Sequence, residues 1–216
     1  MSEPGITEIP VKERPRNLAK TLHLRSVAQQ ESLRRENEEL KLKSETDSLT
    51  GLHNRAYFDE QALKLQSEHA RGASNYAVVV MDLDGFKRVN DKYGHGVGDE
   101  VLKAFADIIS NSPDKKDPLI RRSDHVARIG GDEFGVLMTN YNPDANKEDW
   151  VRNLEERLTK ELRLKVSKMY PEYTEAAGVG VSVGIASPQE GEEFKDTLKR
   201  ADKMVYARKQ EKGASR

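Results

Sequence analysis

Two short apolar segments on either side of a Gly-Gly-Asp-Glu sequence constrain the fold of this chain more than any other feature. Val126–Ile129 and Phe134–Met138 are separated by the two glycines, and the pattern predicts two strands joined by a hairpin turn. Glycine leaves no side chain between the backbone and a ligand, so a large anion and its metal can approach this turn. Adjacent residues that enter a strand point to different sides, so we expect different functions for Asp132 and Glu133. The alternative is an exposed acidic turn.

The charge balance excludes two classes of partner. The 216 residues include 36 Lys and Arg against 37 Asp and Glu, for a net charge of −1, which gives no electrostatic basis for binding nucleic acid or a membrane surface. The longest apolar run, Ala77–Met81, is too short to span a bilayer, and Met1–Arg16 is charged and contains proline, unlike a signal peptide. Cysteine is absent, which excludes thiolate metal sites. We expect a soluble, cytoplasmic protein with one domain and an appendage.

The appendage is predicted to be a tail and a helix. Residues 1–17 contain three prolines and scattered charge, so we expect disorder there. Residues 18–46 lack Gly and Pro and are rich in helix formers. Within them Leu33, Asn37 and Leu40 have the spacing of a two-stranded coiled-coil seam. The helix is therefore either a dimerisation segment or a solvated linker.

Residues 47–212 are predicted to form a globular domain in which strands and helices interleave. This order is typical of a mixed sheet covered by helices. A Gly-rich stretch at 93–99 is expected to be a loop, and 111–119 a polar connection. We expect strands at 76–82, 126–129, 134–138 and 178–186, and helices at 56–71, 100–110, 144–169 and 194–212.

Asp82 stands where a buried strand meets a loop. A carboxylate there is costly unless it is paired or binds a cation, and a lone Asp at a strand end is usually a cap. Together with Asp132 and Glu133 it would form an oxygen-rich site suited to Mg²⁺. Proteins commonly bind nucleotide phosphates with Mg²⁺ and a nearby basic residue, here Lys87.

Two further polar residues could recognise a purine. Asp99 can accept two donors that lie side by side, and the amide of Asn90 can donate and accept. Guanine presents N1–H and N2–H₂ as adjacent donors, so the pair fits guanine.

Five motifs occur in one order over about residues 47–209. They are Asp47–Arg55, Asp82–Asp91, Gly94–Asp99, Arg128–Phe134, and Ala201-Asp202 with Tyr206 and Lys209. In these motifs the chain resembles the GGDEF family of diguanylate cyclases, which join two GTP into cyclic di-GMP and release two pyrophosphates. The resemblance implies bacterial second-messenger signalling. It also implies an α+β, palm-like domain with a central mixed, mainly antiparallel sheet covered by helices.

The resemblance implies a metal site and a general base. Asp82, the backbone carbonyl of Leu83 and Asp132 would bind Mg²⁺, with Mn²⁺ as an alternative, and Glu133 would complete the acidic site. Asp132 would also be the base that takes the proton of the 3′-hydroxyl.

The resemblance also implies how GTP is held. Lys87, Lys209 and the backbone N–H groups near Phe86 would balance charge on the phosphates. Asn90 and Asp99 would hold guanine, and His95 would lie close to the nucleotide.

Arg121 and Asp124 have the RxxD spacing of the family's inhibitory product site, with five residues between Asp124 and Gly130. Arg121 could bind a phosphate or the Hoogsteen edge of guanine, and Asp124 could accept from N1–H and N2–H₂. An Arg and an Asp at this spacing are more often a local ion pair. Their placement before the hairpin favours binding of cyclic di-GMP.

Two features depart from the family pattern. The connection at 111–119 is longer than usual. The family's last helix ends in Lys-x-x-Gly-Arg, whereas Lys209–Gly213 has one extra residue, and Gly213 takes the place of a phosphate-binding Arg. Either Lys212 or Arg216 substitutes for that Arg, or the affinity for triphosphate is reduced.

The predicted function is a diguanylate cyclase that acts as a homodimer, in which each 3′-hydroxyl attacks the α-phosphate of the other GTP. Product inhibition would act at the RxxD site. One alternative is a catalytically silent GGDEF module that binds GTP or cyclic di-GMP as a sensor. Another is a scaffold that dimerises through residues 18–46.

Overall fold

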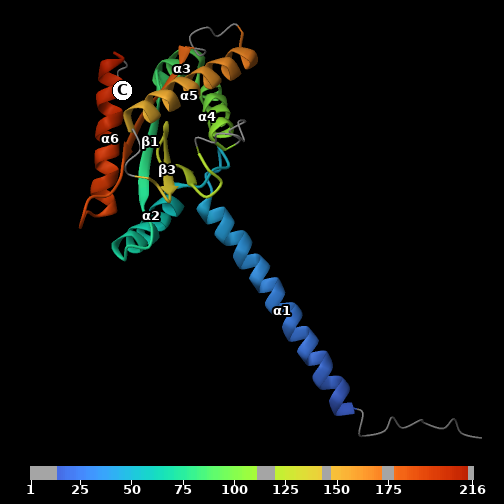
Figure 1. Ribbon diagram of the computed structural model, residues 1–216. Coiled ribbons are helices and arrows are strands. Elements are labelled where there is room, and N and C mark those ends of the chain that lie inside the picture. The colour runs from blue at the N-terminus through green and yellow to red at the C-terminus, as the bar shows by residue number, and fades with distance from the viewer. Residues whose placement is uncertain (1–13, 111–119, 143–146, 172–177, 214–216) are drawn as a thin grey trace, which may run out of the picture. The chain divides into compact units, whose positions relative to one another are not determined.

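The computed structural model describes residues 14–110, 120–142, 147–171 and 178–213, which fall into two compact units with a boundary between residues 44 and 45 (Figure 1). The described part of the first unit belongs to a single helix, α1 (Arg14–Glu45). It begins four residues before the predicted start, and its second residue is Pro15, which is tolerated in the first helical turn because no intrahelical N–H bond is needed there. The predicted tail before residue 14 lies outside the described residues.

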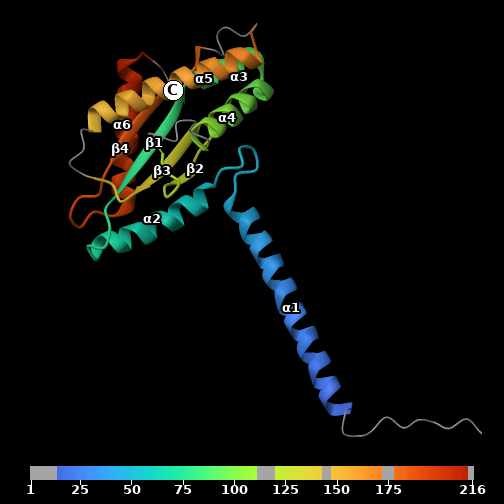
Figure 2. The ribbon, with the colours of Figure 1, turned by 45° about the vertical axis from the view of Figure 1, so that its right-hand side comes forward.

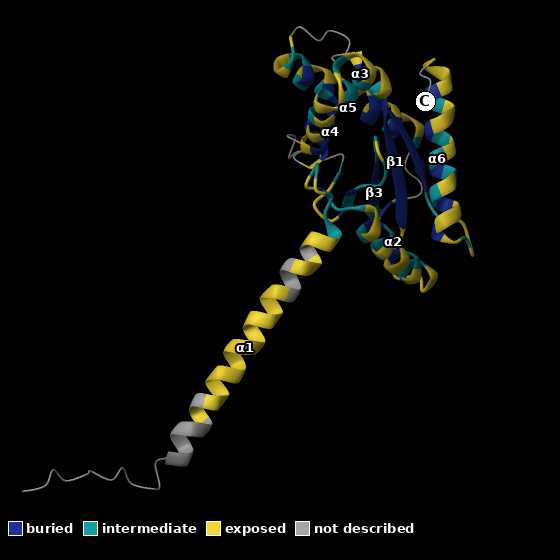
Figure 3. Ribbon diagram, turned by 180° about the vertical axis from the view of Figure 1, so that it is seen from behind, coloured by how far each residue is buried: buried dark blue, intermediate teal, exposed yellow. Residues whose placement is uncertain are grey.

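The apolar side chains of α1 face solvent. Leu33 is 51% exposed and Leu40 is 58% exposed in the single chain, and Figure 3 shows the described part of α1 as exposed along its length. The side chain of Asn37 lies outside the description. Whether this helix pairs with a second copy stays a prediction. Among the described helices, none is long and apolar enough to span a membrane.

The second unit is built on a four-stranded sheet in the order β2-β3-β1-β4, and every neighbouring pair of these strands is antiparallel. One isolated parallel bridge joins His53 to Ala127 of β2. The predicted α+β fold with a mainly antiparallel sheet is therefore confirmed. The strands are β1 (Tyr76–Asp84), β2 (His125–Arg128), β3 (Glu133–Thr139) and β4 (Gly180–Ala186).

Helices cover both faces of this sheet. All nine residues of β1 are buried, and alternate residues of the strand pack into two separate apolar clusters, one with α2 and α6 and the other with α3, α4 and α5. Figures 1 and 2 show α6 and α4 on opposite sides of β1. The helices are α2 (Arg55–Ala70), α3 (Phe86–Tyr93), α4 (His95–Ser110), α5 (Lys147–Met169) and α6 (Phe194–Glu211).

The predicted hairpin is confirmed, and its strands lie within one residue of the predicted positions. The N–H of Ile129 donates to the carbonyl of Glu133 at 2.9 Å, which closes the turn. A β-carbon on Gly135 would lie 2.7 Å from the ring of Phe58 in α2. Glycine at this position therefore allows α2 to pack directly on the sheet behind the hairpin.

The Gly-rich stretch at 93–99 is not the loop that we expected, because α4 begins at His95. Gly94 adopts a φ of 83° and separates α3 from α4. Gly98 is buried where the two helices meet. At Gly98 the lack of a side chain allows the two helices to pack closely, so the high glycine content at 93–99 does not indicate a loop.

Both edges of the sheet are covered. On β4, the N–H of Val181 donates to Thr159 Oγ1 at 3.0 Å and the N–H of Val183 donates to Glu155 Oε1 at 2.7 Å. Both acceptors belong to α5. On β2, the N–H of Arg128 donates to the carbonyl of His53 at 2.8 Å.

Candidate active site

Three predicted carboxylates meet where β1 ends. Asp82 is paired with Glu133 in the antiparallel register of β1 and β3. The N–H of Leu83 donates to the backbone carbonyl of Asp132 at 3.3 Å. The sheet therefore brings Asp82, Leu83, Asp132 and Glu133 together, although no three metal-ligating side chains in the described part of the chain already converge as a cluster.

Asp82 is paired with a lysine from the last helix. Both Asp82 and Lys209 are 3% exposed, and Lys209 Nζ donates to Asp82 Oδ1. Burial raises the pKa of Asp82 to about 6, against the effect of the Lys209 bond, and the nearby charges of Asp132 and Glu133 add to the rise. Carboxylates that repel one another in a buried site favour a bound cation, so the donor set fits a divalent metal.

A salt bridge fixes the hairpin turn to the segment before α2. Arg128 Nη1 lies 3.2 Å from Asp47 Oδ1. Arg128 Nη2 donates to the carbonyl of Gly131 at 2.7 Å. Two motifs that are 81 residues apart in the chain thus hold the acidic turn in place.

Asp84 is a site residue that the sequence analysis missed. It is 9% exposed, and its carboxylate accepts from Ser182 Oγ at 2.8 Å and from Lys212 Nζ at 3.5 Å. The signal was present, because residues two apart in a strand share a face. Asp84 therefore continues the acidic surface that begins at Asp82.

The turn after β1 presents a helix N-terminus beside the carboxylates. Gly85 adopts a φ of 74° and caps α3 without a side-chain hydrogen bond. The first N–H groups of this helix, at Phe86 and Lys87, have no intrahelical acceptor and can bind an anion. The side chain of Lys87 is exposed. Both residues lie where the sequence predicted phosphate contacts.

Asn90 carries a buried acceptor without a partner. Its Oδ1 is inaccessible to solvent and makes no hydrogen bond to any described residue. A β-carbon on Gly98 would lie 1.9 Å from this atom, so the glycine of α4 provides the space that Asn90 occupies. His95 and Asp99 are exposed and one helical turn apart on α4. The α3–α4 pair therefore groups the predicted base-binding residues.

A polar cleft of about 600 Å³ opens next to Asp84. It lies between the start of α3, the beginning of β4 and the end of α6, and we name it the basic cleft. The side chains that decide its charge are Lys87, Arg88, Arg163, Lys212, Asp84 and Asp91.

The RxxD residues lie at the other end of the sheet. Asp124 is 9% exposed, and its carboxylate accepts from the backbone N–H of Arg121 at 2.8 Å and of Thr139 at 3.0 Å. The carboxylate of Asp124 therefore contacts backbone N–H groups and does not form the local ion pair with Arg121 that was the alternative interpretation. Thr139 pairs with Tyr76 at the start of β1, about six residues, or roughly 20 Å, from the acidic end.

The chain matches a protein-family model and is similar to two curated proteins. The family model described as diguanylate cyclase, GGDEF domain, matches residues 44–215. DgcT of Escherichia coli (strain K12), described as a probable diguanylate cyclase, is 38% identical over 167 residues, which cover 76% of this chain and 33% of that protein. The diguanylate cyclase DgcS of Shewanella oneidensis is 34% identical over 172 residues, 80% of this chain and 52% of that protein.

The structure is also similar to a solved structure of a GGDEF domain. The coiled coil and GGDEF domain of DgcB from Caulobacter crescentus, in complex with c-di-GMP, matches with a TM-score of 0.70 and 28% identity. The match covers 89% of this chain and 95% of that one. The chain spans only a third to a half of the length of the two curated relatives.

Proposed function

The chain belongs to the GGDEF-domain family of diguanylate cyclases, and we propose that it joins two GTP into cyclic di-GMP and releases two pyrophosphates. The observation that carries the proposal is the pairing of Asp82 with Glu133 beside Asp132 at the buried end of β1. None of the carboxylates that the reaction needs is missing. A family member that had only a structural role would not need to keep this repulsive group of acids.

The metal site would be made by oxygens that the sheet register brings to neighbouring positions. Asp82, the Leu83 carbonyl, Asp132 and Glu133 would hold Mg²⁺, with Mn²⁺ as an alternative. At such a site the ion supplies charge neutralisation on phosphate oxygens and a lowered pKa of a coordinated hydroxyl. Lys209 Nζ donates a hydrogen bond to Asp82 Oδ1. On binding GTP, its ammonium group would turn to the phosphates.

Asp132 would accept the proton of the 3′-hydroxyl as that oxygen attacks the α-phosphate of the second GTP. The new P–O bond forms as the bond to pyrophosphate breaks. Lys87 and the open N–H groups at the start of α3 would stabilise the charge on the phosphates. Because each hydroxyl needs a second GTP, the reaction requires two domains that face each other.

Guanine would be recognised between α3 and α4. The Oδ1 of Asn90 is a buried acceptor without a partner among the described residues, and a donor of guanine would satisfy it. Asp99 can accept from N1–H and N2–H₂ of guanine, and His95 lies on the same side of α4, one turn away. An adenine ring offers no such pair of adjacent donors.

The homodimer and the product control belong to the same proposal. The exposed apolar side chains of α1, among them Leu33 and Leu40, would pair with those of a second copy. The exposed side chain of Arg121 and the carboxylate of Asp124 would bind cyclic di-GMP as an inhibitor.

One assay tests the function and separates it from its alternatives. Purified protein is incubated with GTP and Mg²⁺, and the products are separated by chromatography. We expect cyclic di-GMP and pyrophosphate in a one-to-two ratio, and a fall of about 10²-fold or more for Asp132→Asn, which removes a metal ligand and the base. A matched change of an exposed α6 residue, Lys203→Gln, should leave the rate unchanged. GTP binding without product would establish the silent sensor. If the protein neither binds GTP nor forms product, the scaffold is the remaining alternative.

A further inference from the structure

We propose that Lys212 and Arg163 bind the β- and γ-phosphates of the nucleotide in the basic cleft, and so replace the arginine that the family pattern places at Gly213. The inference rests on the proposed function and concerns the side chains that hold its substrate. The inference is carried by two cations that line the same cleft, Arg163 from α5 and Lys212 from the residue directly after α6.

The backbone conformation at position 213 favours glycine over a residue with a side chain. Gly213 adopts a φ of 64° directly after α6, and its N–H donates to the carbonyl of Gln210 at 3.0 Å. This left-handed conformation is strained for an arginine. The extra residue in the C-terminal motif therefore moves the helix stop to the position of the family's arginine.

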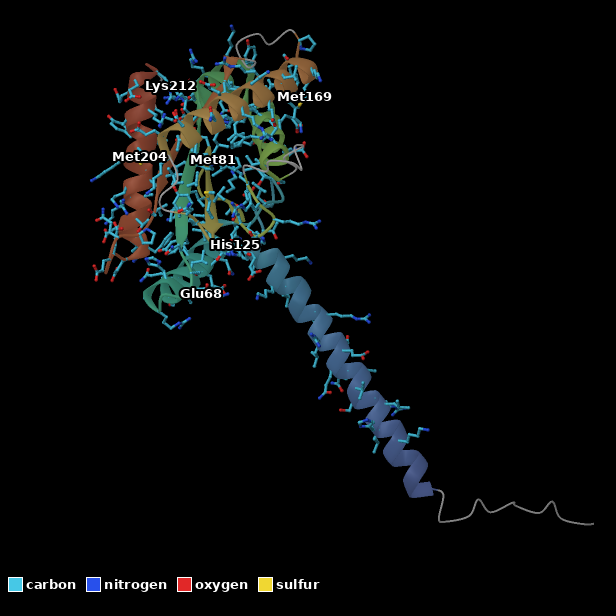
Figure 4. The ribbon with its side chains drawn as sticks, viewed as in Figure 1. Glu68, Met81, His125, Met169, Met204 and Lys212 are labelled. Carbon is cyan, nitrogen blue, oxygen red and sulfur yellow. The ribbon has the colours of Figure 1, made fainter. Side chains whose placement is uncertain are left out.

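Lys212 stands one residue earlier and reaches the cleft. Its Nζ donates to the carbonyl of Val181 at 2.8 Å and lies 3.5 Å from Asp84 Oδ2 and 3.4 Å from Glu155 Oε1. Ser182 Oγ also accepts from Nζ at 3.2 Å. The side chain is 37% exposed and lines the cleft, so a phosphate that enters the cleft can replace one of these acceptors. Figure 4 shows Lys212 at the end of α6, at the opposite end of the domain from His125.

Arg163 approaches from α5. Its Nε donates to the carbonyl of Val179 at 2.9 Å, which fixes the guanidinium at the edge of the cleft. The side chain makes no ion pair within the described ranges. A guanidinium with free N–H groups and no carboxylate partner can bind a phosphate with two parallel hydrogen bonds.

The charge of the cleft fits a polyphosphate. Four cationic side chains line it against two carboxylates, and one of these, Asp84, is already bonded by Ser182 and Lys212. Lys87, at the start of α3, lines the cleft together with Asp84, which lies two residues after Asp82 in β1. An extended triphosphate could therefore run from the metal site into the cleft, with its terminal phosphates against Arg163 and Lys212.

A purely structural role for Lys212 makes a different prediction. If the lysine only neutralises Asp84 and Glu155, its removal should lower stability and weaken every nucleotide alike. If it binds terminal phosphates, the loss should depend on the number of phosphates. Arg163 is exposed and contacts only backbone carbonyls, so Arg163→Gln tests the same idea with little effect on the fold.

The experiment measures binding by calorimetry with three probes: inorganic pyrophosphate, 3′-deoxy-GTP and 3′-deoxy-GMP. The deoxy compounds lack the attacking hydroxyl and cannot react. We expect Lys212→Gln and Arg163→Gln each to weaken pyrophosphate and 3′-deoxy-GTP about tenfold, as for one lost hydrogen bond to a charged group, and to leave 3′-deoxy-GMP within about twofold. Lys212→Arg should retain binding. Lys203→Gln removes the same charge from an exposed site on α6 and should change nothing.

Equal weakening of all nucleotides, or no weakening of 3′-deoxy-GTP in either variant, would overturn the inference while leaving the proposed function intact. If the parent protein binds neither nucleotide, the proposed function fails. In that case the affinity for pyrophosphate still tests the phosphate site in the basic cleft. Weaker pyrophosphate binding in both variants supports the site, and unchanged binding in both variants overturns it.

Discussion

Lys209 in α6 donates a hydrogen bond to Asp82 at the end of β1, and the two side chains are 127 residues apart in the chain and 3% exposed. The pair links the last helix to the central strand at the acidic end of the sheet. Removal of one partner leaves the other charge buried without compensation, which destabilises a protein more than loss of the whole pair.

We therefore expect Lys209→Met to lower the free energy of unfolding by about 3 kcal/mol or more. The double variant Asp82→Asn, Lys209→Met should be more stable than Lys209→Met, because the uncompensated carboxylate is gone. Urea unfolding of both variants and of the control Lys203→Met measures the difference. A Lys209→Met protein as stable as the parent would show that Asp82 is neutralised in another way.

Gly98 and Gly96 provide a matched pair on α4. A β-carbon on Gly98 would collide with Asn90 Oδ1, whereas one on Gly96 would meet nothing within 4 Å. We expect Gly98→Ala to displace Asn90 and to weaken binding of 3′-deoxy-GTP roughly tenfold, the loss of one or two hydrogen bonds. Gly96→Ala should keep the affinity and raise stability by up to about 1 kcal/mol. Equal affinities of the two variants would remove Asn90 from the base-binding site.

Substitutions at Arg121 and at Asp124 should have different effects on stability, although both should affect inhibition by the product. The side chain of Arg121 is exposed, but Asp124 holds the backbone N–H groups of Arg121 and Thr139. Arg121→Ala should thus keep the initial rate and stability and lose inhibition by added cyclic di-GMP. Asp124→Ala should also destabilise the fold by about 1–3 kcal/mol, because buried donors lose their acceptor. Inhibition curves that Arg121→Ala leaves unchanged would refute the product site.

His125 should make stability depend on pH. Its Nδ1 lies 3.0 Å from the hydroxyl of Tyr57. Burial lowers the pKa of His125, the nearby His53 lowers it further, and Asp124 opposes the shift. The unfolded chain therefore binds a proton more readily, so stability is lost as the pH falls below the ordinary value near 6.5 and through the lowered pKa.

The parent protein should accordingly lose more thermal stability between pH 7.5 and pH 5 than His125→Gln does. Thermal unfolding of both proteins across this range measures the effect. His69→Gln serves as the control, because His69 also lies in the second unit but has no contact with Tyr57 or His53 among the described interactions. Parallel pH profiles for the parent and His125→Gln would show that His125 does not control this dependence.

Removal of residues 1–44 should leave the catalytic unit folded, because the boundary between the compact units lies at this point. Pairing through α1 would raise the effective concentration of the second domain to roughly mM. We expect the truncated form to bind GTP like the parent but to gain activity per subunit as its concentration rises. A dilution series for both forms measures this. Equal activity and equal concentration dependence would place dimerisation in the catalytic unit.

Local patterns were enough to predict the acidic hairpin and the buried strand before it. A double glycine between two apolar segments determines where the strands end, so Asp132 and Glu133 could be placed relative to Asp82. The same reasoning failed at residues 93–99, because glycine is common both in loops and where helices pack closely. Only the contact between Gly98 and Asn90 distinguishes the two cases.

The partners of Asp84 could not be inferred from the local sequence. Its partners Ser182 and Lys212 are 98 and 128 residues away, so nothing near Asp84 in the sequence indicates them. The bond between Lys209 and Asp82 likewise appears only when α6 packs on the sheet. Sequence patterns predicted the candidate site residues, and the tertiary contacts show which of them have a charged partner in the fold.

The covered sheet edges restrict how copies of this domain can associate. Side chains of α5 bond the N–H groups of Val181 and Val183, and the carbonyl of His53 bonds Arg128 on the opposite edge. At these positions a strand from another molecule finds no free donor, which prevents growth into a continuous intermolecular sheet. In the homodimer that we propose, two catalytic domains would therefore meet through side-chain surfaces. Such surfaces can separate and reorient between rounds of synthesis.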